Sequence, residues 1–275
     1  MQTENFHSQM MAGENTTKQP LVFIGHGDPM NALRDNAFTK SLNVLGKDLI
    51  ALEKPKAILC VSAHWLTRGT YINNAEKPPT IHDFGGFPQE LFDVQYPAAG
   101  SPDYAGKTKE LVKDSELTTD WGLDHGAWTV LKHVFPLADI PVYQMSIDYY
   151  RSMSYHFELA KQLSALREKG VLIVGSGNVV HNLQLSFQKM MEGDSKAYDW
   201  AIEFDQWVKD RIWDCNWTEL ANYEKQSGGK LSVPTPDHYA PLMYVMGLAG
   251  NQEPIQSIYE SVEFGGISMR TFKIG

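Results

Sequence analysis

The sequence predicts a single α/β domain with a mainly parallel central sheet flanked by helices. Short, almost wholly apolar runs recur along the chain, segments of helical character separate them, and 275 residues suit one large domain. Apolar runs that do not alternate with polar residues are typical of strands covered on both faces. Because strands and helices alternate, the sheet is expected to be parallel.

The expected strands are rich in β-branched side chains and lie at residues 21–25, 57–63, 141–147 and 171–175, with a closing strand at 268–274. The expected helices lie at residues 36–53, 105–112, 125–134, 155–169, 198–213 and 240–248. Residues 1–20 lack the basic start and apolar stretch of a signal peptide. We therefore expect a disordered leader at 1–20 and the folded domain at 21–275.

Residues 77–102 contain many prolines and glycines with aromatic residues between them. A loop of this length inside a compact domain is usually functional. We expect it to form a lid or the wall of a pocket.

Composition excludes several classes of function. The net charge is -9 with both signs mixed along the chain, which argues against nucleic-acid and anionic-membrane partners. No run reaches the roughly 18 apolar residues that a membrane span needs, so a cytoplasmic location is expected. Two distant cysteines provide neither a disulfide framework nor a thiolate zinc site. The sequence leaves the oligomeric state, including a homo-oligomer, open.

Three of the nine histidines come at the ends of predicted strands. His26 follows the first strand, His64 follows the second, and His181 follows the strand at 171–175 through the turn SGNVV. Because ligands bind at the C-terminal edge of open parallel sheets, we expect these side chains to lie together there. A lone buried histidine is usually a core residue, whereas three at equivalent positions indicate a metal site. Imidazole binds zinc and iron alike, so the residue type does not choose the metal.

Two further histidines are candidates for the same site. His238, in PTPDHYAPL, precedes a predicted helix, and Asp237 beside it could instead serve as the helix cap. His125, in GLDHGAW, begins another helix with Asp124 as a possible orienting partner, and it could equally be structural. No chemistry is assigned to His7, His133 or His156.

Other catalytic motifs are missing from the sequence. It contains no Walker-type phosphate loop, no G-x-S-x-G elbow and no His-Glu-x-x-His helix. Nucleotide hydrolysis, serine hydrolysis and the common zinc peptidase chemistry are therefore unsupported.

Several strings closely resemble the DOPA 4,5-dioxygenase family: GHGDPMNAL, VSAHW, PPTIHDFGGFP, YPAAGSP, GLDHGAW, SGNVVHNL and PTPDHYAPL. They occur in order from about Leu21 to the C-terminus. Members are extradiol ring-cleaving enzymes, in the superfamily that includes the protocatechuate 4,5-dioxygenase catalytic chain. The resemblance implies that O₂ is inserted into a catechol ring next to the diol, as in the conversion of L-DOPA to 4,5-seco-DOPA, at a mononuclear non-haem metal site.

The resemblance also implies roles for the histidines. His26 and His64 would be metal ligands, His181 the active-site base that also touches the metal, and His125 a substrate-facing helper. The wider superfamily completes its site with a carboxylate, whereas this branch offers His238, which we expect as the remaining ligand with Asp237 as the substitute. Fe(II) is expected for activity, and Zn(II) can occupy such a site because it outcompetes Fe(II) at most N/O sites. The aromatic residues expected to line the slot are Phe84, Phe87, Tyr96, Trp128 and Tyr239.

Two alternatives stay open on the residues alone. A zinc-dependent hydrolase of a small amide or lactone would use several neutral histidines and a bound water in the same way. A non-catalytic metal-binding domain would instead close the coordination sphere with protein ligands.

Overall fold

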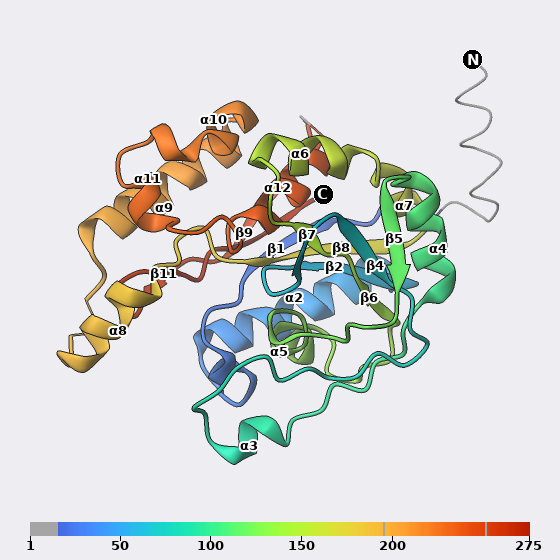
Figure 1. Cartoon of the computed structure of the whole chain (residues 1–275), viewed down its shortest axis with the longest axis horizontal. Coiled ribbons are helices and arrows are strands. Elements are labelled where there is room, and N and C mark those ends of the chain that lie inside the picture. Colours follow the sequence, from blue (N-terminus) through green and yellow to red (C-terminus); the bar gives the residue numbers. More distant parts are fainter. Residues whose placement is uncertain (1–15, 195, 251) are drawn as a thin grey trace.

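The computed structural model describes residues 16–194, 196–250 and 252–275, and its centre is a six-stranded sheet in the order β6-β2-β8-β1-β12-β9 (Figure 1). Neighbouring strands from β6 to β1 are parallel, and β12 pairs antiparallel with β1 and β9. The sheet strands are β1 (Leu21–Gly25), β2 (Ala57–Ser62), β6 (Val142–Gln144), β8 (Val171–Gly177), β9 (Ile255–Tyr259) and β12 (Thr271–Ile274). The predicted single α/β domain with a mainly parallel sheet is confirmed.

Helices cover both faces of this sheet. α2 (Ala37–Glu53) and α5 (His125–Val134) lie on one face, and α6 (Met153–Lys161) and α12 (Ala240–Leu248) lie on the other (Figure 1). Side chains alternate between two apolar cores, so that Val22 packs with α2 and α5 while its neighbour Phe23 packs with α12. Burial on both faces is the reason for the continuous apolar runs in the sequence.

The remaining elements are short or peripheral. The further helices are η1 (Pro29–Ala32), α3 (Gln89–Phe92), α4 (Pro102–Leu111), α7 (Ser164–Glu168), α8 (Leu183–Met191), α9 (Asp199–Trp213), α10 (Trp217–Ala221), η2 (Tyr223–Lys225) and α11 (Gly229–Ser232). Three small strand pairs join β3 (Leu66–Thr67) to β7 (Ile147–Asp148), β4 (Thr70–Asn73) to β5 (Ser115–Thr118), and β10 (Val262–Glu263) to β11 (Ile267–Ser268). Within the described residues, no helix combines the length and the apolar character that crossing a membrane requires.

Three predicted elements are divided in the structure. The strand expected at 141–147 becomes β6 and β7, because the Ser146 amide donates to Tyr71 O and draws the chain away from the sheet. The helix expected at 155–169 becomes α6 and α7, because the amides of Gln162 and Leu163 bond three residues back and tighten the helix there. The closing strand becomes β11 and β12.

The chain before β1 is packed where the structure describes it. Residues 1–15 of the expected leader lie outside the described residues, but Gln19 is buried. Its amide donates to Arg167 O over 3.0 Å, and Arg167 Nε donates to Gln19 O over 2.7 Å. Residues 16–20 therefore differ from the predicted disordered leader.

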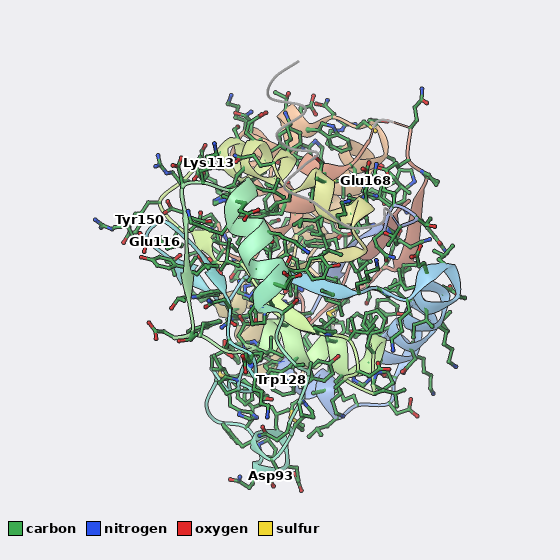
Figure 2. The ribbon with its side chains drawn as sticks, turned by 90° about the vertical axis from the view of Figure 1, so that its right-hand side faces the viewer. Asp93, Lys113, Glu116, Trp128, Tyr150 and Glu168 are labelled. Carbon is green, nitrogen blue, oxygen red and sulfur yellow. The ribbon has the colours of Figure 1, made fainter. Side chains whose placement is uncertain are left out.

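The proline- and glycine-rich segment 77–102 is an extended loop interrupted by the short helix α3. Figure 2 shows Asp93 from this loop at one end of the molecule. Trp128 of α5 is fully buried. Trp128 Nε1 donates to Ile81 O over 2.9 Å, and Tyr96 Oη donates to Phe135 O over 3.1 Å. These bonds fix the loop against α5, where it becomes a wall of the site described next.

Candidate metal centre

Five histidines converge at the C-terminal edge of the parallel strands. β2, β8 and β1 are adjacent in the sheet, so the residues that follow them meet at one edge. His26 follows β1 directly, His64 follows β2 after one residue, and His181 follows β8 through a short turn. Together with His125 and His238 they line a cavity of about 350 Å³. The structure therefore brings together all five histidines that the sequence singled out.

A glycine allows the chain before α12 to reach this edge. A side-chain carbon at Gly177, the last residue of β8, would lie 2.2 Å from His238 O, which is too close for any other residue. The next amide, that of Asn178, donates to the same oxygen over 2.8 Å. This close approach carries His238 to the strand ends although it is distant in sequence.

The tautomer of His26 follows from its hydrogen bonds. His26 Nδ1 lies 3.0 Å from Ser176 Oγ, and the same hydroxyl donates its single proton to Gly126 O. Ser176 therefore accepts from His26 Nδ1–H, and the lone pair of the ring is on Nε2. His26 Nε2 lies 3.2 Å from His64 Nε2, so this lone pair is directed toward the other imidazoles.

Asp83, from the long loop, lies beside two more of the rings. Its Oδ1 lies 3.0 Å from His125 Nδ1 and accepts from the His125 amide over 2.9 Å. Its Oδ2 lies 3.6 Å from His64 Nδ1, beyond hydrogen-bond length. Burial raises the pKa of Asp83, but the hydrogen bonds and charge of His125 outweigh it and lower the pKa overall. Sequence reasoning missed this residue; the available signal was an aspartate next to a histidine in the functional loop.

Asp124, the expected partner of His125, has a different task. It is the N-cap of α5, where Oδ1 accepts from the Ala127 amide over 3.2 Å and from Ser62 Oγ over 2.6 Å. Its Oδ2 accepts from Gln144 Nε2 over 2.7 Å. Asp124 thus ties the start of α5 to β2 and β6, and it orients His125 through the backbone.

His238 and His181 form a stacked pair. Their ring centres are 3.5 Å apart and the ring planes differ by 6°. His238 Nδ1 donates to the carboxylate of Asp237. Burial raises the pKa of Asp237, but this hydrogen bond and the charge of His238 outweigh it and lower the pKa well below its usual range. Asp237 therefore orients His238, and no side chain caps α12.

These imidazoles have the protonation state that metal binding requires. Burial, followed by the proximity of other histidines, lowers the pKa of His26 and His64 well below the usual value. Burial and His238 do the same for the pKa of His181. Neutral imidazole is the form that coordinates a metal. Donor atoms of His26, His64 and His125 lie within 4.8 Å of one another and could together hold a metal ion.

The spacing of the rings gives a second grouping. The ring centres of His26 and His64 are 5.0 Å apart, those of His26 and His238 are 5.2 Å apart, and those of His64 and His238 are 5.0 Å apart. His125 is placed less evenly, at 3.7 Å from His64 and 5.9 Å from His26. An almost equilateral set of rings suits a shared ion with each nitrogen at about 2.1 Å.

The rest of the cavity is mainly apolar. Phe84 and Phe87 of the long loop line it, as the sequence predicts. Tyr96, Trp128 and Tyr239, which were expected in the slot, are instead buried core residues. Helix α8 and the β10–β11 turn supply four lining side chains that sequence reasoning missed: Leu183, Phe187, Met190 and Phe264.

The remaining described histidines have structural partners. His82 Nε2 lies 3.0 Å from Val94 O, His133 Nε2 lies 2.8 Å from Asn31 O, and His156 Nδ1 lies 3.0 Å from Tyr244 Oη. None of the three lines the cavity. His7, to which no chemistry was assigned, lies outside the described residues.

Comparison with known proteins identifies the class of enzyme. Residues 18–271 match the family described as the catalytic LigB subunit of aromatic ring-opening dioxygenase. The chain belongs to this family. It is therefore an oxidoreductase, an extradiol dioxygenase that takes a small-molecule substrate and O₂, and the resemblance seen in the sequence is confirmed. This result favours the dioxygenase over the zinc hydrolase and the non-catalytic domain.

Individual relatives of this dioxygenase agree with the family. The chain is 48% identical over 267 residues to the 4,5-DOPA dioxygenase extradiol of Escherichia coli (strain K12), covering 95% of this chain and 96% of that protein. It is 36% identical over 273 residues to the protein of the same name from Beta vulgaris, covering 96% and 98%. A crystal structure of an uncharacterized protein from Escherichia coli K12 matches with a TM-score of 0.80 and 42% identity, over 94% of this chain and 100% of that one.

Proposed function

We propose that this dioxygenase opens a catechol ring next to the diol, with L-DOPA as a substrate and 4,5-seco-DOPA as the product. One observation carries the proposal: five histidines, three of them with pKa values lowered by burial, converge in a cavity walled by aromatic and aliphatic side chains. The names of the relatives support the choice of substrate. Both atoms of O₂ enter the product while one carbon–carbon bond of the ring breaks.

We assign His26, His64 and His238 as the ligands of a single divalent metal ion. The even spacing of their rings supports this assignment. Ser176 holds His26 and Asp237 holds His238 through Nδ1, which leaves the opposite nitrogen of each ring available as a donor. When bound, the ion would supply a centre that attracts both the diol and dioxygen. Fe(II) is the ion proposed for activity, and Zn(II) is an inactive occupant.

His181 is proposed as the base that takes a proton from the diol. Its neutral ring lies against His238 and lines the cavity, and within the described residues no hydrogen bond from protein occupies its ring nitrogens. It is therefore free to accept the proton and to return it to the product. His181 stacks on the proposed ligand His238, so we propose that it also contacts the metal.

His125 is proposed as the helper that steadies negative charge. Asp83 Oδ1 lies 3.0 Å from Nδ1 of its ring and holds the backbone amide of His125, which leaves Nε2 for the substrate. Phe84 packs at 5.5 Å from the His125 ring and, with Phe87, supplies an apolar wall for the catechol ring. A water-poor wall strengthens these electrostatic interactions.

One assay tests the proposal. Protein freed of metal is reconstituted anaerobically with Fe(II), L-DOPA is added, O₂ is admitted, and oxygen uptake is followed together with the appearance of a yellow product. Stoichiometric uptake and ring opening are expected. No turnover of any catechol with Fe(II), together with ester or amide hydrolysis with Zn(II), would overturn it.

We further propose that residues 21–275 form the catalytic domain and that it works in the cytoplasm on small molecules, without nucleic acid or membrane. The mixed distribution of a net charge of -9 supports the absence of nucleic-acid and anionic-membrane partners.

A further inference from the structure

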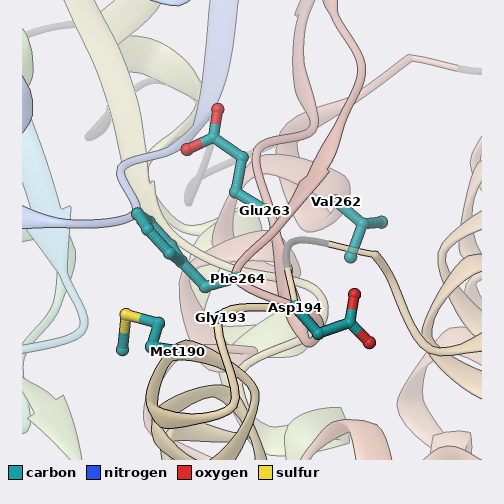
Figure 3. Close-up of a pocket in the computed structure, with 6 residues that line it drawn as sticks. All are labelled: Met190, Gly193, Asp194, Val262, Glu263 and Phe264. Carbon is teal, nitrogen blue, oxygen red and sulfur yellow. The ribbon is translucent and has the colours of Figure 1, made fainter.

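A second hollow adjoins the catalytic cavity. Met190 and Phe264 line both the cavity and an adjoining hollow of about 430 Å³. Figure 3 shows the residues of this hollow, with Glu263 and Phe264 directed to one side and Asp194 to the other. A substituent that extends from a ring held among the histidines would therefore pass Met190 and Phe264 to reach it.

A tight turn sets this boundary. Phe264 (φ 50°) and Gly265 (φ 81°) are both left-handed and connect β10 to β11. A left-handed phenylalanine is uncommon and marks a position that the surroundings enforce. Glu263 pairs across this turn with Ile267, which lines the catalytic cavity. Glu263 is therefore one strand away from the site.

The charges near the boundary are unbalanced. Among the described residues, neither hollow is lined by lysine or arginine, while Asp28, Asp194 and Glu263 contribute carboxylates. Asp28 is neutralised by Arg34 at 2.9 Å, and Asp194 is paired with Lys189. Within the described part of the chain, the Glu263 carboxylate has neither a hydrogen bond nor an ion pair. Arg34 and Asp28 are near enough to shift its pKa. Asp28, Arg34 and Glu263 together carry one net negative charge.

Partial burial makes this charge effective. Burial raises the pKa of Glu263, the proximity of Arg34 lowers it, and that of Asp28 raises it again. A half-buried carboxylate without a partner is costly, and an incoming cation would relieve the cost. An incoming carboxylate would instead meet two negative groups and a single arginine that is already occupied.

We propose that Glu263 selects catechols whose side chain carries a protonated amine and disfavours those whose side chain carries only a carboxylate. The ring lies among the histidines, and the side chain passes Met190 and Phe264 so that its ammonium group pairs with Glu263. This inference rests on the proposed catechol dioxygenase activity, and it concerns only the substituent.

The test compares three catechols on the Fe(II)-loaded enzyme: dopamine as the cation, 4-methylcatechol as the neutral reference and 3,4-dihydroxyphenylpropionate as the anion. Wild-type protein is expected to favour dopamine over the anion in kcat/KM by about tenfold or more, as for an ion pair away from bulk water. Glu263→Gln is expected to lose most of this preference and to leave 4-methylcatechol unchanged. Glu263→Lys is expected to reverse the order of the two charged substrates.

Binding provides a second readout. Zinc has no redox chemistry, so dissociation constants of the same catechols with the zinc-loaded protein report recognition without turnover. They should change in parallel with kcat/KM. Glu116→Gln makes the same chemical change on exposed β5, where Figure 2 shows Glu116 at the surface, and it should leave the preference intact.

The results of these assays distinguish failure of the Glu263 proposal from failure of the proposed catechol dioxygenase activity. Cleavage of 4-methylcatechol with no change of amine preference in either Glu263 variant would overturn the role of Glu263 and leave the dioxygenase intact. Equal loss for all three catechols in Glu263→Gln would also overturn it, because a selecting group must discriminate by charge. Cleavage of none of the three by wild-type protein would contradict the activity itself.

Discussion

Two environments of buried histidine can be compared in this protein. Five histidines meet at the ends of the parallel strands, whereas His156 lies between α6 and α12 with its Nδ1 3.0 Å from Tyr244 Oη. Burial lowers the pKa of His156 to about 4, and it also lowers the pKa of His26. A lowered pKa therefore does not distinguish a histidine of the site from a histidine of the core.

What differs is the set of neighbours. At the strand ends, His26, His125 and His238 each have an oxygen at Nδ1, and their opposite faces meet other imidazoles around a cavity. His156 instead faces an aromatic hydroxyl inside a packed helix pair. Repeated orientation of several rings toward one space indicates metal chemistry, and a single satisfied ring indicates packing.

The largest expected effect belongs to the centre of the cluster. His26→Ala should abolish stoichiometric metal binding and reduce turnover by roughly a thousandfold or more, because a bound ion would supply several kcal/mol of stabilisation to the reaction. Metal content by elemental analysis and oxygen uptake check this. Full retention of metal in this variant would remove His26 from the ligand set.

His181→Ala should separate metal binding from chemistry. We expect the metal to stay and kcat to fall by about 10²–10⁴-fold, the usual contribution of a positioned base. The comparison requires both measurements on the same preparation. If metal is lost as completely as in His26→Ala, then His181 is a ligand first and a base second.

Asp83→Asn should have a smaller effect through the rings it orients. Loss of such an orienting carboxylate typically weakens metal affinity by about 10–100-fold. Competition with a chelator measures the affinity. Asp93→Asn, an exposed position in the same loop, is the matched control and should bind metal like the wild type. Equal affinity in both variants would show that Asp83 does not orient the ligands.

The smallest effect on activity is expected at His156. His156→Gln keeps a hydrogen-bonding group for Tyr244 and should leave metal content and turnover unchanged. Its effect is on acid stability. In the unfolded chain His156 is protonated near pH 6.5, whereas in the folded protein it is protonated only near pH 4. The free energy of unfolding therefore falls as the pH drops from 6.5 to 4.

The expected size of this loss is roughly 3 kcal/mol, a figure that already includes the attraction of nearby Asp148. Urea unfolding at several pH values measures it in wild type and variant. Identical pH dependence in the two proteins would mean that His156 is not the group responsible.

The sequence could predict the strand ends because their information is local. A continuous apolar run followed by a histidine needs only the rule that parallel strands share an edge, and His26 and His64 both satisfied it. β9 was missed because its side chains are only partly buried and its sequence, IQSIY, is not a continuous apolar run. α8 was missed although its cavity-lining residues Leu183, Phe187 and Met190 recur at helical spacing, because the helix is short and largely exposed.

The partners of the histidines were harder to foresee. Asp83 reaches His125 only because the loop is fixed by bonds such as that from Trp128 to Ile81, and such tertiary contacts leave no local signature. Asp124 precedes α5 at the position of a helix cap, and its carboxylate is used as that cap. Its place next to His125 in the sequence therefore wrongly suggested that it orients the His125 ring. The contact of Ser176 with His26 could not be predicted, because a single serine inside a strand carries no signal of a particular partner.

The route of the chain into the site has a thermodynamic consequence. His26, His64 and His238 come from β1, β2 and the segment before α12, which are far apart in sequence and meet only in the folded state. An ion held among them would act as a reversible crosslink that the unfolded chain cannot reproduce. At a free metal concentration a thousand times the dissociation constant, this linkage adds about 4 kcal/mol to the free energy of unfolding. Metal supply would then determine how long each molecule survives as well as how fast it works.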